Sequence, residues 1–258
     1  MRIDCIIQSF GYTDFLEITL PRNKGFFDSV TVWTKTGDEA TKAVCAREGV
    51  RCVETDLFTK NGSKFNRGAA FNAAFREIVQ EYANKGGYPQ WCCILDSDIV
   101  LPPNFRAQFE SSNPDSECFY GARRYNVETI DQWEKIKNWD QSELDKLVLF
   151  RGYGYSYLSL HHFCSSTFLS LWHQTRGNPY LEWEDGSTAD WVFRNNFGSH
   201  SWDPPTLPPD HILDHSVPEP CDPPNGLLRK LPFNVIHLGV AGINAKGRET
   251  PLWTVKSE

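Results

Sequence analysis

The segment WCCILDSDIVLP at residues 91–102 contains a short apolar run that leads directly into an Asp-Ser-Asp motif. A run this short and continuous is typical of a strand that is covered on both faces of a parallel sheet. Open parallel sheets bind their ligands just beyond the carboxyl ends of the strands. The sequence therefore predicts that Asp96 and Asp98 lie at a sheet edge where a binding site is expected.

Segments on the N-terminal side of this run alternate between strand and helix patterns. The predicted strands and helices span, in order, residues 3–8 (strand), 27–34 (strand), 36–46 (helix with its cap), 50–53 (strand) and 66–82 (helix). Such alternation is typical of parallel strands that are connected by helices. We predict an α/β fold with a central, mostly parallel sheet flanked by helices.

The second half of the chain is less regular. It contains predicted strands at 118–122, 153–160 and 235–238, predicted helices at 163–173 and 189–195, and a charged stretch of mixed helical signals at 130–150. Residues 202–224 hold eight of the sixteen prolines, which favours an extended loop. With no internal repeat and no recognisable linker, residues 1–258 are predicted to form a single domain.

Composition narrows the classes of function. The formal net charge of −7 argues against a protein held on DNA or anionic membranes by its overall field, although a local basic groove remains open. Neither a membrane-length apolar run nor a signal peptide is recognisable, so we expect a soluble cytoplasmic protein. Aromatic residues reach 14%, which suits stacking on flat ligands as well as ordinary core packing.

The two aspartates of the motif indicate a cation site. Carboxylates at positions i and i+2 repel each other unless a cation lies beside them. Mg²⁺ and Mn²⁺ prefer such oxygen ligands and keep positions free for phosphate oxygens. The alternative is an ordinary surface turn, in which Asp and Ser are also common.

Leu95-Asp96-Ser97-Asp98, preceded by strand and helix units, resembles the DxD motif of nucleotide-sugar-dependent glycosyltransferases of the GT-A fold. Residues 66–72 resemble the segment of that family that closes over the nucleotide sugar. Residues 3–11 resemble the first strand and loop, which hold uridine and ribose. Residues 235–239 resemble the late strand whose histidine completes the metal shell.

The resemblance covers residues 1–120 well and the remainder loosely. It implies a GT-A (Rossmann-like) domain in which residues 1–120 bind the nucleotide sugar and residues 121–258 bind the acceptor. It also implies a UDP-sugar as donor and a divalent metal, Mn²⁺ or Mg²⁺. The metal ligands that it implies are Asp96, Asp98 and His237, and Asp96 would reach the ribose or a water on the metal.

Donor-binding residues follow from the same resemblance. The implied set is Gln8, Ser9, Phe10, Gly11, Arg67, Asn72, Asp96, Ser97 and Arg248. Arg67 and Arg248 would contact the pyrophosphate, since guanidinium groups suit phosphate oxygens. Three alternatives stay open: Arg67 as a solvated residue in the first turn of a helix, Arg248 as a tail residue, and His237 as a core histidine bonded to backbone.

Inverting transfer also needs a general base near the acceptor hydroxyl. In the family, an acidic residue at the start of a late helix serves this purpose, and Asp190, which precedes Trp191, matches it best. Asp185 in the Glu184-Asp185 pair is the second candidate. The alternative is a plain charged loop.

The C-terminal segment suggests an acceptor. His237-Leu238-Gly239, with Asn244 and Gly247-Arg248, is similar to the base J-associated DNA glucosyltransferases and their viral relatives. That similarity implies UDP-glucose as donor and DNA with 5-hydroxymethylated pyrimidines as acceptor. We expect no membrane and no obligate protein partner. Basic pairs such as Arg123-Arg124 and His161-His162 could line a DNA groove or form ordinary solvated surface.

Two other functions remain open. One is a glycosyltransferase that acts on a saccharide or another small acceptor. The other is a noncatalytic sugar- or nucleic-acid-binding module, in which Asp96 and Asp98 would be dispensable.

Overall fold

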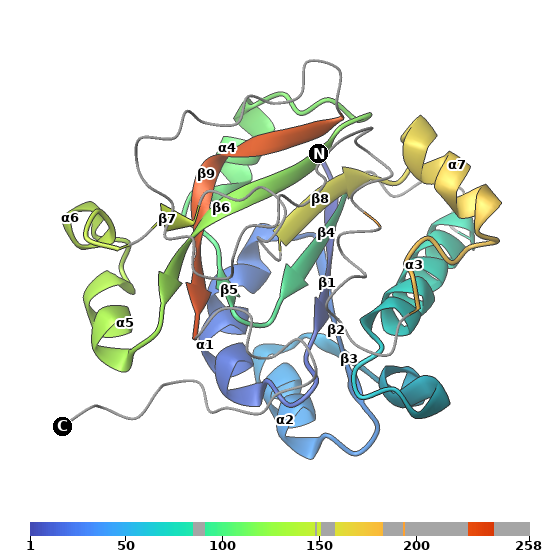
Figure 1. Ribbon diagram of the computed structural model, residues 1–258, viewed down its shortest axis with the longest axis horizontal. Coiled ribbons are helices and arrows are strands. Elements are labelled where there is room, and N and C mark those ends of the chain that lie inside the picture. The colour runs from blue at the N-terminus through green and yellow to red at the C-terminus, as the bar shows by residue number, and fades with distance from the viewer. Residues whose placement is uncertain (85–90, 148, 151–157, 183–192, 194–226, 240–258) are drawn as a thin grey trace, which may run out of the picture.

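The computed structural model describes residues 1–84, 91–147, 149–150, 158–182, 193 and 227–239. Its strands form one sheet in the order β3-β2-β1-β4-β8-β6-β9-β5, with β7 paired to β6 (Figure 1). The strands are β1 (Ile3–Gln8), β2 (Ser29–Lys35), β3 (Arg51–Thr55), β4 (Trp91–Asp96), β5 (Ile99–Val100), β6 (Phe119–Val127), β7 (Leu149–Phe150), β8 (Leu158–His162) and β9 (Leu228–Leu238).

Helices connect these strands. They are α1 (Thr13–Asn23), α2 (Glu39–Glu48), α3 (Arg67–Asn84), α4 (Phe105–Ser111), α5 (Ile130–Ile136), α6 (Gln141–Leu144) and α7 (Ser166–Gln174), with 3-10 helices η1 (Lys24–Phe26) and η2 (Asp56–Gly62). In the described part of the chain, no helix combines the length and the apolar character needed to cross a membrane.

Parallel pairing is concentrated in the N-terminal half of the sheet. Strand β1 runs parallel to β2 and β4, and β2 runs parallel to β3. In the other half, β8 runs antiparallel to β4 and β6, whereas β6 and β9 are parallel to each other. The predicted α/β fold is confirmed, and its second half is a mixed sheet.

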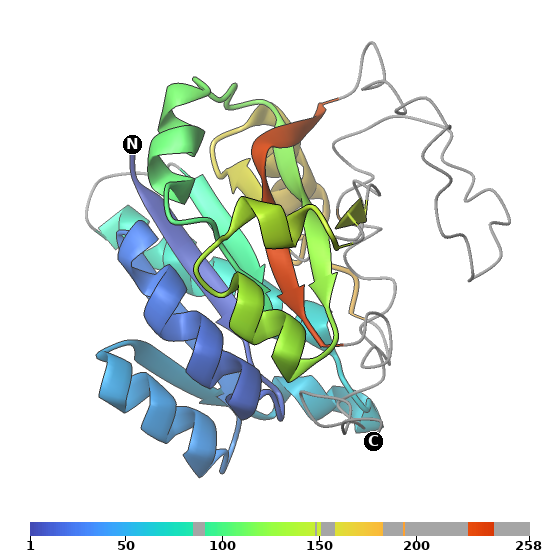
Figure 2. The same cartoon turned by 90° about the vertical axis from the view of Figure 1, so that its left-hand side faces the viewer.

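Alternate side chains of β4 enter different cores. Cys93 and Leu95 pack in a cluster with residues of α1 and α2, whereas Cys92 and Ile94 pack with residues of α3 and α7. Helices therefore cover both faces of the sheet (Figures 1 and 2). Burial on both faces explains why the sequence of β4 is almost continuously apolar.

Helix α1 is the main element that the sequence analysis did not predict. Pro21 lies inside it, and a proline removes a hydrogen-bond donor from a helix. Phe15, Leu16 and Leu20 are buried against the sheet and stabilise the helix through tertiary packing.

Several predicted elements fall outside the described residues. These are the first part of the strand predicted at 153–160, the helix predicted at 189–195 apart from Phe193, and the proline-rich loop predicted at 202–224. The division into a donor half and an acceptor half stays a prediction.

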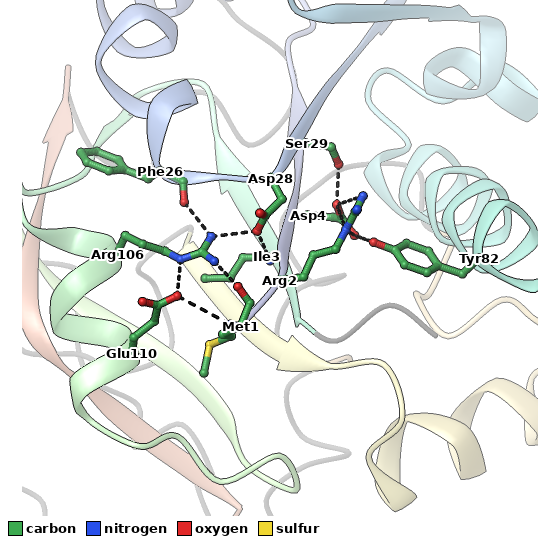
Figure 3. A network of polar contacts seen from close by, with 10 residues as sticks. All are labelled: Met1, Arg2, Ile3, Asp4, Phe26, Asp28, Ser29, Tyr82, Arg106 and Glu110. Atoms are coloured by element: carbon green, nitrogen blue, oxygen red, sulfur yellow. Dashed lines mark hydrogen bonds and ion pairs between the residues drawn. The ribbon is translucent and has the colours of Figure 1, made fainter. Parts of the chain in front are cut away.

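A polar network joins the amino-terminal ends of the central strands to α4 (Figure 3). Arg106 of α4 donates to Asp28 at 2.9 Å and to Glu110 at 2.6 Å. It also donates to the backbone oxygens of Met1, just before β1, and Phe26, just before β2. Nearby, Asp4 of β1 accepts a hydrogen bond of 2.5 Å from the hydroxyl of Tyr82. The network fixes the end of the sheet that lies away from the Asp-Ser-Asp motif.

Candidate functional site

Strands β1 and β4 end side by side at Gln8 and Asp96, which are paired in register. We call this end of the two strands the carboxyl edge. The side-chain Nε2 of Gln8 donates to the backbone oxygen of Arg67 at 3.0 Å. The Oε1 atom of Gln8 is buried and accepts no hydrogen bond from the described residues. This oxygen can therefore accept a hydrogen bond from a ligand that binds at the carboxyl edge.

Arg67 lies at the first position of α3 and points back to the carboxyl edge. Its Nη2 donates to Oδ1 of Asp96 at 2.5 Å, and the Arg67 side chain is only 7% exposed. The rings of Phe65 and Phe71 flank the guanidinium, with centroids 6.0 and 5.6 Å from its central carbon. Arg67 is therefore a positioned site residue rather than a solvated residue of a helix start.

Ser97 shapes the turn between the two aspartates. Its hydroxyl donates to the backbone oxygen of Gln8, and its own backbone oxygen accepts from the hydroxyl of Thr19 at 2.7 Å. The Ser97 side chain is buried, and its hydroxyl is already hydrogen-bonded to Gln8. We therefore assign Ser97 to fixing the turn and not to contacting a nucleotide sugar.

Asp98 and His237 meet beside this turn. Ile99 of β5 is paired with His237 of β9, and the backbone N–H of Leu238 donates to the backbone oxygen of Asp98 at 2.8 Å. These contacts place Oδ2 of Asp98 3.4 Å from Nε2 of His237. The structure thus joins two of the three predicted metal ligands and gives His237 a side-chain partner.

The other carboxylate oxygen of Asp98, Oδ1, is in an unusual environment. Oδ1 is buried and has no hydrogen-bond partner among the described residues. Burial by itself would raise the pKa of this carboxyl group, but His237 and the charges of Arg124 and Arg67 outweigh burial and lower the pKa. Burying an ionised carboxylate oxygen without a hydrogen-bond donor lowers the stability of the folded protein unless a cation or a ligand interacts with that oxygen.

The residues after β1 divide into buried and peripheral ones. The Ser9 side chain is fully buried, and its backbone oxygen accepts from the hydroxyl of Thr34 at 2.6 Å. Phe10 is half-buried, and its ring packs against those of Phe58 and Phe65 with centroids 5.4 Å apart in both pairs. Gly11 is exposed and has a φ of 73°, which favours glycine. Phe10 and Gly11 are thus the accessible members of this predicted set.

Asn72 joins the two halves of the chain. Its Nδ2 donates to the backbone oxygen of Tyr180 at 3.0 Å, and its Oδ1 accepts from the Tyr180 N–H at 2.8 Å. The Asn72 side chain is fully buried. Its amide therefore holds the segment around Tyr180 against α3, and it is not brought to the carboxyl edge.

Three predicted site residues lie outside the described part of the chain. They are the candidate bases Asp185 and Asp190 and the candidate pyrophosphate contact Arg248. Their roles stay predictions.

No family model matches this chain. No curated protein is significantly similar to it either. Among solved structures, a mycobacterial protein aligns with 13% identity and a TM-score of 0.37 over 62% of this chain and 53% of the other. Glucosyl-3-phosphoglycerate synthase from Mycobacterium tuberculosis, in complex with Mn²⁺, UDP-glucose and phosphoglyceric acid, aligns with 11% identity and a TM-score of 0.39.

That second alignment covers 62% of this chain and 56% of the synthase. The chain therefore spans little more than half the length of these solved structures. Similarity at this level does not assign an activity, which has to be argued from the side chains of the site.

The side-chain atoms at the carboxyl edge that can act as metal ligands fit a divalent cation. A carboxylate oxygen without a donor and an imidazole nitrogen are both ligands of Mn²⁺ and related metals. Among the described residues, no group of three or more His, Cys, Asp or Glu side chains could hold a metal ion. Further protein ligands would have to come from another residue type or from outside the described ranges.

Three residues of the predicted basic groove do not lie at the surface. Arg123, Arg124 and His161 are at most 4% exposed. They therefore cannot form a DNA-binding surface, because buried charges do not reach phosphates. Arg124 instead adds positive charge near Asp98.

Asn126 is a residue near the site that was not predicted from the sequence. The feature that could have pointed to it is a polar residue between the buried side chains of Tyr125 and Val127 on one strand. Its significance depends on which residue of β9 it faces, and sequence alone does not give that pairing.

Proposed function

We propose that this chain is a metal-dependent glycosyltransferase of the GT-A type that moves a hexose from a UDP-sugar to an acceptor hydroxyl. The observation that carries the proposal is the meeting of Asp98 with His237 at the carboxyl edge, where one oxygen of Asp98 has no donor among the described residues. A core histidine or a surface turn would not require such an oxygen. The order of motifs along the sequence supports the same activity.

In the proposed reaction, the acceptor oxygen bonds to the anomeric carbon while the bond from that carbon to the diphosphate breaks. The electron pair leaves with UDP, and the proton of the acceptor goes to a carboxylate, for which Asp190 and then Asp185 are the candidates. A bound divalent cation would neutralise the charge that develops on the diphosphate. Asp98 and His237 would hold that cation.

Residues of β1 and α3 would bind the donor. Gln8 offers a buried acceptor oxygen, and Phe10 offers a half-buried ring at the end of β1. Arg67 would balance the charge of the diphosphate while it holds Asp96 in place. Each of these groups is held by contacts with neighbouring residues of the fold, which limits the entropy lost on binding.

The acceptor is a separate part of the proposal. Hydroxymethylated pyrimidine in DNA is the acceptor that the C-terminal motif suggests, and a saccharide or other small acceptor is the alternative within the class. Burial of Arg123 and Arg124 favours the small acceptor, since it removes two cations from the groove that DNA would need.

The test is sugar transfer from a panel of labelled UDP-sugars with Mn²⁺. Acceptors are duplex DNA with 5-hydroxymethylcytosine or 5-hydroxymethyluracil, unmodified DNA, a set of small sugars and phosphorylated acids, and water alone. We expect turnover of one donor by the wild type and by Asp145→Ala, an exposed carboxylate on the far side of the sheet, and none by Asp98→Ala. Equal turnover in folded Asp98→Ala would contradict the metal site that carries the proposal, whereas no turnover of any donor by the wild type would favour a binding module.

A further inference from the structure

The metal site suggested by Asp98 and His237 is short of protein ligands among the described residues. Within the described ranges, only these two side chains of the usual ligand types converge there. Mn²⁺ and Mg²⁺ are commonly six-coordinate and also accept amide oxygens. An oxygen atom on a neighbouring strand that faces the same way could complete the set.

Asn126 of β6 is paired with His237 of β9 in the parallel ladder between these strands. Side chains on paired positions of neighbouring strands project to the same face of a sheet, and successive side chains project to opposite faces. The residues on either side of each belong to the cluster packed under α5: Tyr125, Val127, Ile236 and Leu238. Asn126 and His237 therefore lie side by side on the opposite face.

The amide oxygen of Asn126 is not used by the described residues. Its Oδ1 is buried and accepts no hydrogen bond from the described residues. Oδ1 of Asp98 is in the same state, and Oδ2 of that carboxylate is 3.4 Å from His237. One buried oxygen that accepts no hydrogen bond from the described residues thus belongs to the carboxylate beside His237, and a second belongs to the residue paired with His237. A shared cation would satisfy both without any new protein donor.

Resting on the proposed function, we propose that Oδ1 of Asn126 is a third protein ligand of the divalent cation, beside Asp98 and His237. An amide oxygen completes a hard, oxygen-rich set and leaves positions for the diphosphate. Arg124 lies two residues before Asn126 and its charge reaches Asp98. A cation alone would be repelled by Arg124, so cation and UDP should bind together.

The first experiment measures Mn²⁺ binding from the paramagnetic resonance signal of free Mn²⁺, with and without UDP. Asn126→Ala is expected to raise the Kd for Mn²⁺ in the presence of UDP by about 10- to 100-fold, the range found when even an outer partner of a metal site is lost. Asn234→Ala is the matched control, because its amide on β9 donates to the hydroxyl of Tyr125 on the other face. The control should stay within about twofold of the wild type, well below the ligand effect.

A second variant separates direct ligation from a structural effect. Asn126→Cys places a soft thiolate at the site, which favours Cd²⁺ over Mn²⁺. We expect an ultraviolet thiolate-to-cadmium band that the wild type and Asn234→Cys lack, together with weaker Mn²⁺ binding. This variant also decides the question if Asn126→Ala does not fold.

The outcomes distinguish this inference from the proposed function. If the wild type does not bind Mn²⁺ with UDP, the metal-dependent function fails and this inference fails with it. If the wild type binds Mn²⁺, Asp98→Ala does not, and both Asn126 variants match their Asn234 controls, the third ligand is overturned and the function stands. Unchanged Mn²⁺ affinity with a raised KM for the UDP-sugar would place Asn126 against the sugar instead and would likewise overturn the inference.

Discussion

Oδ1 of Asp96 accepts a hydrogen bond of 2.5 Å from Nη2 of Arg67, and both side chains are more than four-fifths buried. The pair joins the end of β4 to the start of α3. It compensates the charge of Asp96, whereas Oδ1 of Asp98 accepts no hydrogen bond from any described residue. The two aspartates of one motif are therefore in different electrostatic environments.

Loss of this pair should destabilise the protein. Arg67→Met leaves Asp96 without its cation, and breaking a buried pair costs about 3–5 kcal/mol. Because Asp96 is partly exposed, we expect the free energy of unfolding in urea to fall by an amount near the lower end of this range. Lys60→Met removes the more exposed pair with Glu182 and should cost less than about 1 kcal/mol. Equal losses in the two variants would show that the Arg67 pair is not specially stabilising.

Metal binding should stabilise the folded chain through Asp98. A ligand that binds only the native state adds about 2.7 kcal/mol at a concentration of 100 times its Kd. Mn²⁺ with UDP should therefore raise the Tm of the wild type and of Asp145→Ala, and EDTA should reverse the effect. The Tm of Asp98→Ala should not respond, and a full response in that variant would place the cation elsewhere.

Gly68 should not tolerate a side chain. A Cβ at this position would lie 2.7 Å from the carbonyl carbon of Leu181 and closer still to its oxygen, so the backbone around Leu181 would have to move away from α3. We expect Gly68→Ala to cost about 1–3 kcal/mol and to speed hydrogen exchange in residues 178–182. Gly25→Ala is the control, because no atom lies within 4 Å of the added Cβ. A similar loss in the control would contradict the steric explanation.

His161 should make the protein acid-sensitive. It is fully buried among phenylalanine rings, and burial, with a smaller contribution from His162, lowers its pKa to about 3. The unfolded histidine has a pKa of about 6.5, so between these values the unfolded state binds a proton that the native state does not. The free energy of unfolding therefore falls as the pH drops from about 6.5 to 3, by up to about 1.4 kcal/mol per pH unit.

The measurement is urea unfolding at several pH values in that window. His161→Phe should show a smaller slope of stability against pH than the wild type, whatever its stability at neutral pH. His173→Phe, on the exposed side of α7, serves as the comparison. An unchanged slope in His161→Phe would mean that other groups cause the acid sensitivity.

The network at the amino-terminal ends of the strands should affect stability but not chemistry (Figure 3). Arg106→Met removes the hydrogen bonds to Asp28 and Glu110 and those to the backbone. We expect a loss of about 1–2 kcal/mol, since several charge-assisted bonds of a half-exposed group are broken together. Arg47→Met, whose pairs with Glu17 and Glu48 are exposed, should change stability by less than about 0.5 kcal/mol. A large fall in donor turnover by folded Arg106→Met would contradict this separation.

The sequence predicted the α/β fold from local patterns. The apolar run of β4 and the amphipathic stripe of α3 are properties of contiguous residues, and burial on one or both faces imposes them directly. Helix α1 was missed because Pro21 masks its pattern, whereas its stability comes from contacts of Leu16 and Leu20 with the sheet. Local propensity does not contain that tertiary term.

The position of the candidate site also followed from sequence, because strand ends in a parallel sheet share one edge. Asp96 and Asp98 were placed there by the strand that precedes them. Sequence could not separate their roles. Only the fold brings Arg67 to Asp96 and His237 to Asp98, and it leaves Oδ1 of Asp98 without a hydrogen-bond donor in the part of the chain that the structure describes.

Strand register was decided by tertiary structure alone. Asn126 lies beside His237 because β6 and β9 pair in parallel with one particular alignment, and a shift of one residue would turn each side chain to the opposite face. Asn72 is likewise committed to Tyr180 by packing between distant segments. A single sequence determines which residues can ligate or bond, whereas the folded chain determines which of them meet, because pairing between distant segments depends on the packing of the whole sheet.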